Sequence, residues 1–473
     1  MSILYNQALQ NFDAEPKKIF FYNLKESFSG EEVKKKVLFY EEILKKNIIK
    51  NICLNIPNSV DWATIYIASD NVCENVWIVN PSRISSLNIN EFIEANSIDC
   101  IVNENKNQEG IELDFYNLTK EANKTKKSVR RDILFTSGTS GAPKGVMISE
   151  ESYIYVAQKL VSELKQSKKD LELLSMPFFH SFGLVRLRSV LLSKSSCLIV
   201  DGLKDFPKIY EFSKKNKITG LSLVPSGLEI IKMLLKNKIS DFSKSINYIE
   251  IGSSFINDDL RTWLKKNFTK TNILHHYGMT EASRAFLRPR GAKDDFKIPN
   301  NWIGNPLEGV KFKLLTSKGD ENLGELLLKG KNLFENYVHS ERKILKRGWF
   351  HTKDICQIKN GKLFLMGRTD NQVNIGGEKV QLEEIEKILV SLKMVHDATA
   401  FRVQDKILGE KIAAIVKTEK HKSYKKIKDS INYEFRKFPP FYKPKIIFTL
   451  KPLIRTQNGK KIRDEKLIMD NLL

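Results

Sequence analysis

Residues 135–145 read FTSGTSGAPKG and follow a short apolar run. Closely spaced glycines and hydroxyl residues let backbone N–H groups and short side chains surround a phosphate chain, and Lys144 adds a positive charge. The segment is not a Walker A loop, because Pro143 stands in place of its second glycine and Gly145 in place of the Ser or Thr after the lysine. Taken alone, such a loop is more often a flexible turn than a phosphate site. The candidate phosphate contacts are Thr136, Ser137, Gly138, Thr139, Ser140 and Lys144.

Residues 275–282 (HHYGMTEA) combine groups suited to a nucleotide and to a metal ion. Tyr277 offers a ring face for a purine, Thr280 offers a hydroxyl for a phosphate oxygen, and Glu281 is a hard carboxylate ligand for Mg²⁺. The paired histidines could indicate a transition metal, but adjacent residues rarely reach one ion and no third ligand is evident. The residue types of the segment therefore permit contacts with a nucleotide and with Mg²⁺.

Two further segments contain groups that could border such a site. In residues 250–255 (EIGSSF), Gly252 would let a purine approach the backbone closely, although a plain turn between a strand and a helix is the alternative. In residues 176–183 (MPFFHSFG), His180 lies among aromatic residues, and a hydrogen-bonded histidine beside an aromatic core is an equally good interpretation of the residues alone. The candidate contacts in the first segment are Gly252, Ser253 and Ser254.

Together these motifs resemble those of the adenylate-forming superfamily of acyl- and aryl-CoA synthetases, nonribosomal-peptide adenylation domains and luciferases. The resemblance covers nearly the whole chain, and the motifs occur in the family's order. It implies that ATP activates a carboxylic acid to an acyl adenylate with release of pyrophosphate, and that the acyl group passes to coenzyme A. The phosphopantetheine of a carrier protein is the alternative acceptor, and a catalytically silent adenylate-binding protein is a minor alternative. ATP and Mg²⁺ would be the cofactors.

The resemblance also implies roles for residues nearer the C-terminus. Asp354, in RGWFHTKD, corresponds to the aspartate that holds the ribose hydroxyls, and the family usually has glycine where Lys353 stands. Lys460, in RTQNGKKIR, takes the place of the catalytic lysine, although Ile454 replaces the usual leading proline. The remaining implied roles are Arg368 near the nucleotide, Asp370 as the hinge, and Gly377 and Lys379 at the tunnel for the thiol.

The implied chemistry sets the anionic carboxylate against an anionic α-phosphate, so positive charge and positioning must lower the barrier. Lys460 would bridge the two reactants, and a small C-terminal domain would then rotate to open the thiol tunnel. The predicted catalytic residues are Lys460, Thr280, Glu281 and His180. The residues that would border the acyl pocket, or else belong to the core, are Phe178, Phe179, Phe182 and Leu184.

The elements that position these residues alternate between strand and helix through the first three quarters of the chain, which favours α/β layering. Apolar runs predict strands at 49–56, 76–79, 100–102, 133–135, 196–200, 248–251 and 362–366, with helices at 152–164 and 227–235.

The pattern changes near residues 367–370. Leu382, Ile385 and Leu389 then recur at helical spacing, and a strand at 411–416, a helix at 425–438 and a strand at 445–450 follow. We predict a large multi-layered N-terminal α/β domain over residues 1–367 and a small mobile α+β domain over residues 368–473.

The composition is that of a folded enzyme, with 41% hydrophobic and 28% charged residues in 473. No apolar run reaches the roughly 18 residues of a membrane span, and no export signal is evident, so we predict a cytoplasmic protein. The five cysteines are scattered, which favours reduced, buried thiols. The net charge of +22 comes from dispersed lysines and would attract ATP or coenzyme A, whereas we find no nucleic-acid-binding signature. The substrate would be a small-molecule carboxylic acid that the sequence does not name, and fatty acid metabolism is the expected setting.

Overall fold

The computed structural model describes residues 2–81, 89–105, 110–116, 130–136, 144–253, 255–290, 298–316, 321–375, 378–405, 409–418, 424–456 and 459–472. Contacts within the chain divide it into a large unit and a small unit. The large unit comprises the described residues of Met1–Thr136, Ala142–Phe312 and Leu328–Phe350, and the small unit those of Lys313–Leu327 and His351–Leu473. The boundary predicted between residues 367 and 368 stays a prediction.

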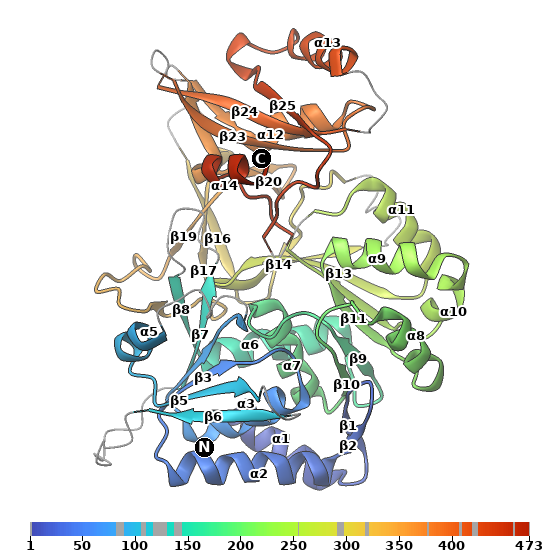
Figure 1. The fold of residues 1–473 in the computed structure, drawn as a ribbon, viewed down its shortest axis with the longest axis vertical. Coiled ribbons are helices and arrows are strands. Elements are labelled where there is room, and N and C mark those ends of the chain that lie inside the picture. The colour runs from blue at the N-terminus through green and yellow to red at the C-terminus, as the bar shows by residue number, and fades with distance from the viewer. Residues whose placement is uncertain are drawn as a thin grey trace. The chain divides into compact units, whose positions relative to one another are not determined.

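In the described part of the large unit, nine strands form one sheet, in the order β15-β14-β13-β12-β11-β9-β10-β1-β2 (Figure 1). The strands β1, β10, β9, β11, β12 and β13 run parallel to one another. At the two ends of the sheet, β2 is antiparallel to β1, β14 to β13 and β15 to β14. Their bounds are β1 (Ile19–Tyr22), β2 (Ser27–Ser29), β9 (Leu171–Leu174), β10 (Ser196–Ile199), β11 (Gly220–Leu223), β12 (Tyr248–Ile251), β13 (Asn272–Met279), β14 (Ala282–Arg290) and β15 (Asn305–Pro306).

A second sheet of the large unit has the order β18-β8-β7-β4-β3-β5-β6 over the residues that the structure describes. The strands β7, β4, β3 and β5 are parallel, and β8 returns antiparallel to β7. Their bounds are β3 (Asn51–Asn55), β4 (Asn75–Ile78), β5 (Cys100–Glu104), β6 (Ile111–Phe115), β7 (Arg131–Thr136), β8 (Lys144–Ser149) and β18 (Asn336–Tyr337).

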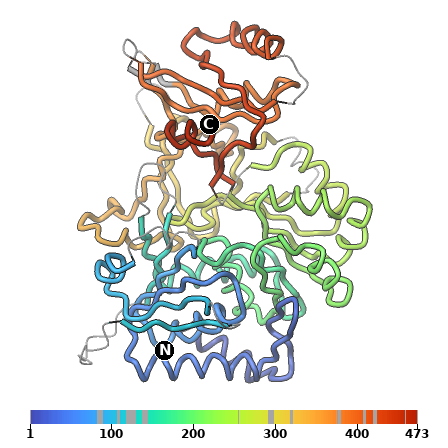
Figure 2. The backbone as a smooth tube through the Cα atoms, viewed as in Figure 1, coloured from blue at the N-terminus to red at the C-terminus, as the bar shows by residue number. Residues whose placement is uncertain are grey.

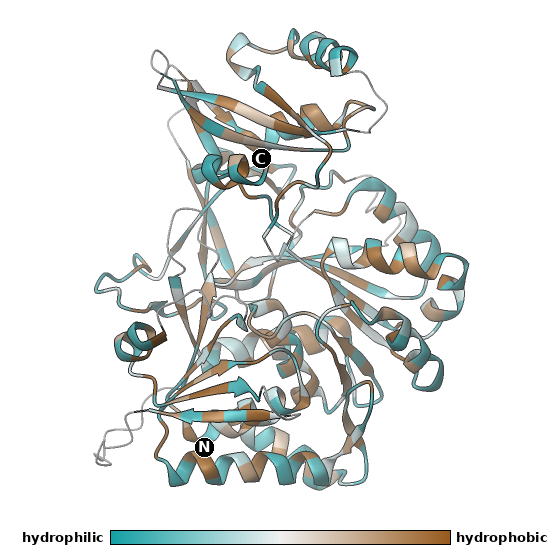
Figure 3. Ribbon diagram, in the orientation of Figure 1, coloured by the Kyte–Doolittle hydropathy of each residue, from teal (hydrophilic) through white to brown (hydrophobic). Residues whose placement is uncertain are grey.

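Helices cover both sheets. The helices α1 (Ile3–Ala14), α3 (Val60–Val72), α6 (Glu150–Leu164) and α7 (Ser181–Ser193) pack together, with α2 (Gly30–Lys46) on α3. This layer touches both sheets, because α3 contacts β3 and β4 while α7 contacts β9. Apolar side chains of α8 (Phe206–Lys215), α9 (Pro225–Leu235) and α11 (Asp258–Asn267) bury the opposite face of the nine-stranded sheet. Figure 3 shows the resulting division into apolar strands and helices with polar outer faces. Shorter helical elements are α5 (Ile89–Asn96), η1 (Lys236–Lys238) and α10 (Ile239–Ser243).

In Figure 2 the small unit is yellow at the described residues of 313–327 and orange to red from residue 351 onward. Four strands pair as β16-β17-β19-β20, and β22-β21-β24-β23 form a further sheet on which β25 pairs with β24. Its core includes Ile385, Leu389, Ala414 and Ile431. The bounds are β16 (Lys311–Thr316), β17 (Leu323–Lys329), β19 (Phe350–Lys359), β20 (Lys362–Arg368), η3 (Thr369–Asn371), β21 (Gln372–Ile375), β22 (Glu378–Gln381), α12 (Leu382–Val390), β23 (Asp397–Asp405), β24 (Gly409–Lys417), α13 (Tyr424–Phe435), η4 (Pro440–Tyr442), β25 (Lys445–Thr449) and α14 (Glu465–Leu472).

The predicted strands and helices are confirmed, with shifts at their ends. The helix predicted from residue 152 begins at Glu150, because the Ser149 hydroxyl accepts a hydrogen bond from the Ser152 N–H and caps it. The helix predicted to residue 438 ends at Phe435, ahead of two prolines that cannot continue it. All five cysteines are unpaired and buried as predicted, and burial raises the pKa of each thiol. Within the described ranges, no helix is long and apolar enough to cross a bilayer.

Candidate active site

The strands around the glycine-rich segment bring Lys144 close to Glu281. The segment joins the antiparallel strands β7 and β8, in which Thr136 pairs with Lys144. The Lys144 ammonium lies 5.3 Å from the centre of the Tyr337 ring, and the Tyr337 hydroxyl donates a 2.9 Å hydrogen bond to Glu281 Oε1. The predicted phosphate-binding lysine and the predicted metal ligand therefore flank one tyrosine. Ser137, Gly138, Thr139 and Ser140 lie outside the described residues.

Thr280 and Glu281 form the turn between β13 and β14. The pairing of the two strands shifts between Tyr277 and Met279, and Gly278 fits there because a Cβ atom would lie 2.6 Å from the Arg284 backbone nitrogen. The turn is thus bent and closely packed. Tyr277 is half-buried, and its ring meets Phe286 edge-on at 5.9 Å, which supports the ring at the position predicted to stack on adenine.

His180 is the residue that precedes the first turn of α7, as its N-cap. It and the neighbouring Phe179 are half-buried, with their rings 4.5 Å apart. Phe178 and Phe182, in contrast, are only 1% and 5% exposed. Phe178 packs on Trp62, so it belongs to the core, whereas Phe179 and His180 are half-buried.

The loop after β12 is fitted to the His276 ring. A Cβ atom on Gly252 would lie 2.1 Å from His276 Cε1, so this backbone touches the imidazole closely enough to require glycine. Ser253 follows with a φ of +72°, and Ser254 lies outside the described residues. The two histidines differ in their partners, since His276 Nδ1 lies 2.7 Å from Glu250 Oε1 whereas His275 Nδ1 lies 2.9 Å from an Arg290 nitrogen.

We predict that Gly252→Ala destabilises the protein by about 1–3 kcal/mol, because the added methyl group collides with the His276 ring. His276→Ala removes the ring, so alanine at position 252 should cost much less in that background. The interaction free energy between positions 252 and 276 is obtained from four free energies of unfolding, those of the parent protein, the two single variants and the double variant. Strictly additive effects would contradict the close contact.

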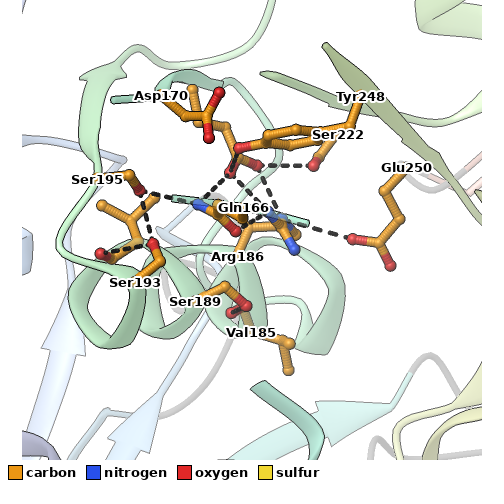
Figure 4. Close-up of polar contacts among 12 residues, drawn as sticks. Gln166, Asp170, Val185, Arg186, Ser189, Ser193, Ser195, Ser222, Tyr248 and Glu250 are labelled. Carbon is orange, nitrogen blue, oxygen red and sulfur yellow. Dashed lines mark hydrogen bonds and ion pairs between the residues drawn. The ribbon is translucent and has the colours of Figure 1, made fainter. Parts of the chain in front are cut away.

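A buried ion cluster adjoins these segments. Its members are Glu172, Arg186, Glu250, His276 and Arg284. Arg186 is fully buried and binds Glu172 with two hydrogen bonds of 2.8 and 2.6 Å. Figure 4 shows the Arg186 guanidinium between Gln166 and Glu250, with Tyr248 and Ser222 close by. Tyr248 and Ser222 also donate to Glu172, so its carboxylate has several donors despite its burial.

Arg284 connects this cluster to the candidate site. Its Nε donates to Glu250 Oε1 at 3.0 Å, while Nη1 and Nη2 donate at 3.0 Å to the Ser181 and Phe182 carbonyl oxygens in the first turn of α7. It has a φ of +49°, a strained value for arginine that the many contacts hold in place. One side chain thus ties together the turn with Thr280, the loop after Glu250 and the helix start beside His180. Sequence reasoning missed Arg284, and the signal that could have found it is the repeated arginine in β14 (ASRAFLRPR), in which Arg284, Arg288 and Arg290 are all buried.

The charges of the cluster balance one another. Burial alone would raise the pKa of Glu250, yet the Arg284 guanidinium and the His276 imidazole hold it below its usual range. Burial, reinforced by Arg284, lowers the pKa of His276, and Glu250 opposes this shift. The guanidinium groups of Arg186 and Arg284 face the carboxylates of Glu172 and Glu250, so these four charges cancel. The cluster therefore supports the site and offers no net charge from these groups to a substrate.

In the small unit, Asp354 and Asp370 share Arg368. Asp354 is 3% exposed and accepts a 2.6 Å hydrogen bond from Arg368 Nη1. Asp370, in η3, accepts from Arg368 Nε and Nη2 at 2.8 and 3.0 Å. Burial raises the pKa of Asp370, but the Arg368 contacts outweigh this effect and lower it. The predicted ribose ligand, the predicted nucleotide contact and the predicted hinge residue are therefore one connected group.

Lys353 has an unusual backbone conformation, with a φ of +63° in the left-handed region that favours glycine. Its side chain is exposed, and its N–H donates to Glu325 Oε1 at 2.9 Å. The lysine is thus a strained substitute at a position suited to glycine.

We predict that Lys353→Gly stabilises the protein by about 0.5–1 kcal/mol, because relief of the left-handed strain exceeds the added freedom of the unfolded chain. Lys359, exposed near the end of the same strand, provides the control, and Lys359→Gly should destabilise by about 0.5–1 kcal/mol. Denaturant unfolding of both variants measures these differences. A loss of stability at position 353 equal to that at 359 would exclude the strain.

Lys460 lies in a tight turn of the small unit. Arg455 pairs with Lys461, the Thr456 N–H donates to the Lys460 carbonyl oxygen at 2.7 Å, and Gly459 takes a φ of +74°. The Lys460 side chain is exposed, whereas the Lys461 ammonium is 2.9 Å from Glu386 Oε2. Gly377 and the side chain of Lys379 lie outside the described residues; Lys379 itself belongs to β22.

Two family models match this chain. The first, described as AMP-binding enzyme, matches residues 75–338, and the second, described as AMP-binding enzyme C-terminal domain, matches residues 384–460.

Among curated proteins, 4-coumarate–CoA ligase 3 of Oryza sativa subsp. japonica is 27% identical over 349 residues. The alignment covers 70% of this chain and 62% of that ligase, so the chain spans less than two thirds of the relative's length.

Solved structures share the fold over almost the whole chain. ATP-bound MatB from Rhodopseudomonas palustris superposes with a TM-score of 0.80, at 19% identity and with 98% of each chain covered. The o-succinylbenzoate CoA synthetase of Bacillus subtilis with its acyl-adenylate intermediate gives 0.79, at 18% identity, and covers 98% of this chain and 97% of that one. The same synthetase is also known in complex with ATP and magnesium ion. The predicted fold class, a large N-terminal α/β domain with a small C-terminal domain, is confirmed.

Proposed function

The chain belongs to the AMP-binding enzyme family, and on this premise we propose that it is an acid–thiol ligase. It activates a carboxylic acid with ATP to an acyl adenylate, releases pyrophosphate and forms a thioester with coenzyme A. The carboxylate oxygen attacks the α-phosphorus, and the bond from this phosphorus to the bridging oxygen of pyrophosphate breaks. The thiol sulfur then attacks the acyl carbon, and AMP departs with the oxygen that had joined it to the acyl group.

The proposal rests above all on the meeting of Lys144, Tyr337 and Glu281 in the large unit. A polyphosphate needs a cation beside it, and its magnesium ion needs a hard anionic ligand. Glu281 fits such an ion, because the carboxylate is half-buried and the Tyr337 hydroxyl occupies only Oε1 of its two oxygens. When bound, Mg²⁺ supplies charge that neutralises the departing pyrophosphate.

The other residues take roles consistent with their surroundings. Tyr277, braced by Phe286, stacks on adenine. Gly252 and Ser253 stay predicted contacts of the purine, although the His276 ring already lies against Gly252. Thr280 donates its hydroxyl to a phosphate oxygen. His180, with its half-buried ring, borders the reacting carboxylate.

The small unit supplies the rest of the chemistry in this proposal. Asp354 accepts the ribose hydroxyls, and Arg368 holds its carboxylate in place. Lys460 is an exposed ammonium on a tight turn, suited to bridging a carboxylate and a nucleotide. Asp370 is the pivot of the domain rotation, and Gly377 and Lys379 border the thiol tunnel. Residues 1–367 and 368–473 are the two proposed domains.

Acid-dependent release of pyrophosphate from ATP tests the first half-reaction, and a panel from short to long-chain acids identifies the substrate. Mass spectrometry with coenzyme A and with carrier proteins then distinguishes the two acceptors. Pyrophosphate release without a thioester to coenzyme A, but with acyl carrier protein, would favour the alternative acceptor. ATP binding without pyrophosphate release for any acid would favour the silent adenylate-binding protein. A role in fatty acid metabolism and a cytoplasmic location stay predictions.

A further inference from the structure

Glu386 is a buried carboxylate of the small unit with several donors around it. It lies on α12, and its side chain is 8% exposed. Lys461 Nζ lies 2.9 Å from Oε2, Arg463 donates from Nε and Nη2 at 3.2 and 3.1 Å, and the Ala400 N–H donates to Oε1 at 3.0 Å. The carboxylate therefore joins α12, β23 and the segment after Lys460.

The contacts of Glu386 are made one and three residues after Lys460. Arg455, on the other arm of the same turn, forms an ion pair with Asp397 at the start of β23, and Lys461 Nζ is also 3.6 Å from Asp397 Oδ1. The two arms are joined by the pairing of Arg455 with Lys461. Both arms of the turn are thus held on α12 and β23, and Lys460 lies between them with its side chain exposed.

We propose that Glu386 is a positioning residue for Lys460 during formation of the acyl adenylate. This inference rests on the proposed function, in which Lys460 bridges the carboxylate and the nucleotide. A lysine side chain is long and flexible, so the backbone that carries it must be fixed for the ammonium to reach its target. A misplacement of about 1 Å in an active site can lower the rate 10²-fold. Glu386 prevents such a displacement by holding the two cations that follow Lys460.

Glu386→Gln tests the proposal, because glutamine has the same shape and still accepts from the Ala400 N–H but carries no charge for Lys461 and Arg463. We expect the kcat for acid-dependent pyrophosphate release to fall about 10–100-fold. Thioester formation from presynthesised acyl adenylate does not use Lys460 and should stay within about threefold. Glu384→Gln is the matched control, since Glu384 is exposed on the same helix and contacts Tyr442 instead; both half-reactions should be unchanged.

A purely structural role for Glu386 predicts a different result. Both half-reactions of the Glu386→Gln protein would then fall together, in proportion to the folded fraction measured by circular dichroism. That outcome, or a normal rate of pyrophosphate release, overturns the proposal. If Glu386→Gln fails to fold, Lys461→Met provides the test. It removes one partner of Glu386 and leaves the Glu386–Arg463 contacts, so the loss should be smaller and again confined to adenylation.

Lys460→Ala in the same assays separates the two levels of inference. If that variant still forms adenylate at the parent rate, the role of Lys460 in the proposed function is wrong. If it is inactive while Glu386→Gln is fully active, the proposed function stands and the positioning role of Glu386 is wrong.

Discussion

Lys460→Ala is expected to lower the rate of acid-dependent pyrophosphate release by about 10²–10³-fold, the loss typical when one positioned donor is removed from a developing negative charge. Thioester formation from presynthesised acyl adenylate should change little, because the amine acts only in the first half-reaction. The two half-reactions are measured separately on one preparation.

The neighbouring lysines make this prediction specific. Lys461 is bound by Glu386, so Lys461→Ala should reduce adenylation less than Lys460→Ala does. Lys466 is exposed on α14, and Lys466→Ala should leave both half-reactions unchanged. A greater loss for Lys461→Ala than for Lys460→Ala would move the catalytic role to Lys461.

Glu281→Gln is expected to raise the Mg²⁺ concentration needed for half-maximal pyrophosphate release by at least about tenfold, equivalent to roughly 1.4 kcal/mol of lost interaction with the ion. The reason is that glutamine keeps the shape and the hydrogen bond from Tyr337 but removes the negative charge. A magnesium titration at saturating acid and ATP measures the shift.

Tyr337→Phe is the matched variant, since it removes the hydrogen bond to Glu281 but keeps the carboxylate and the ring beside Lys144. We expect only a several-fold change in the rate, in line with the loss of about 1 kcal/mol for one hydrogen bond. An unchanged magnesium requirement in Glu281→Gln would assign the metal to another ligand. A shift in Tyr337→Phe as large as in Glu281→Gln would show that orientation of the carboxylate matters more than its charge.

Local sequence patterns predicted much of the fold. The apolar runs that became β3, β4, β10 and β12, and the helical spacing of Leu382, Ile385 and Leu389 in α12, were sufficient because each element buries its own apolar residues. Sequence did not give the order of the strands in the sheets, since strand order depends on which distant segments pair. Contacts between distant segments also place the described residues of Lys313–Leu327 with the small unit.

The candidate site divides in the same way. The residue types of Lys144, Thr280 and Glu281 predicted contacts with a nucleotide and its metal ion, and the resemblance to the family's motifs predicted the roles of Asp354 and Lys460. Lys460 and Lys461 are adjacent and chemically identical, so only the resemblance to the family's motif, and not the residue chemistry, favours Lys460. The tertiary structure adds that the buried Glu386 holds the Lys461 ammonium, whereas the Lys460 side chain is exposed.

Tertiary structure also decided which residues support the site. Tyr337 lies 56 residues from Glu281, and Arg284 lies 34 residues from Glu250 and about a hundred from the start of α7, so no local spacing marks these contacts. The left-handed conformation of Lys353, within β19, likewise does not follow from lysine's own preference. Residue types set the chemistry available in this chain, whereas burial and backbone geometry selected the groups that meet. The reason is that hydrogen bonds and ion pairs act over a few ångströms in space, whatever the separation along the sequence.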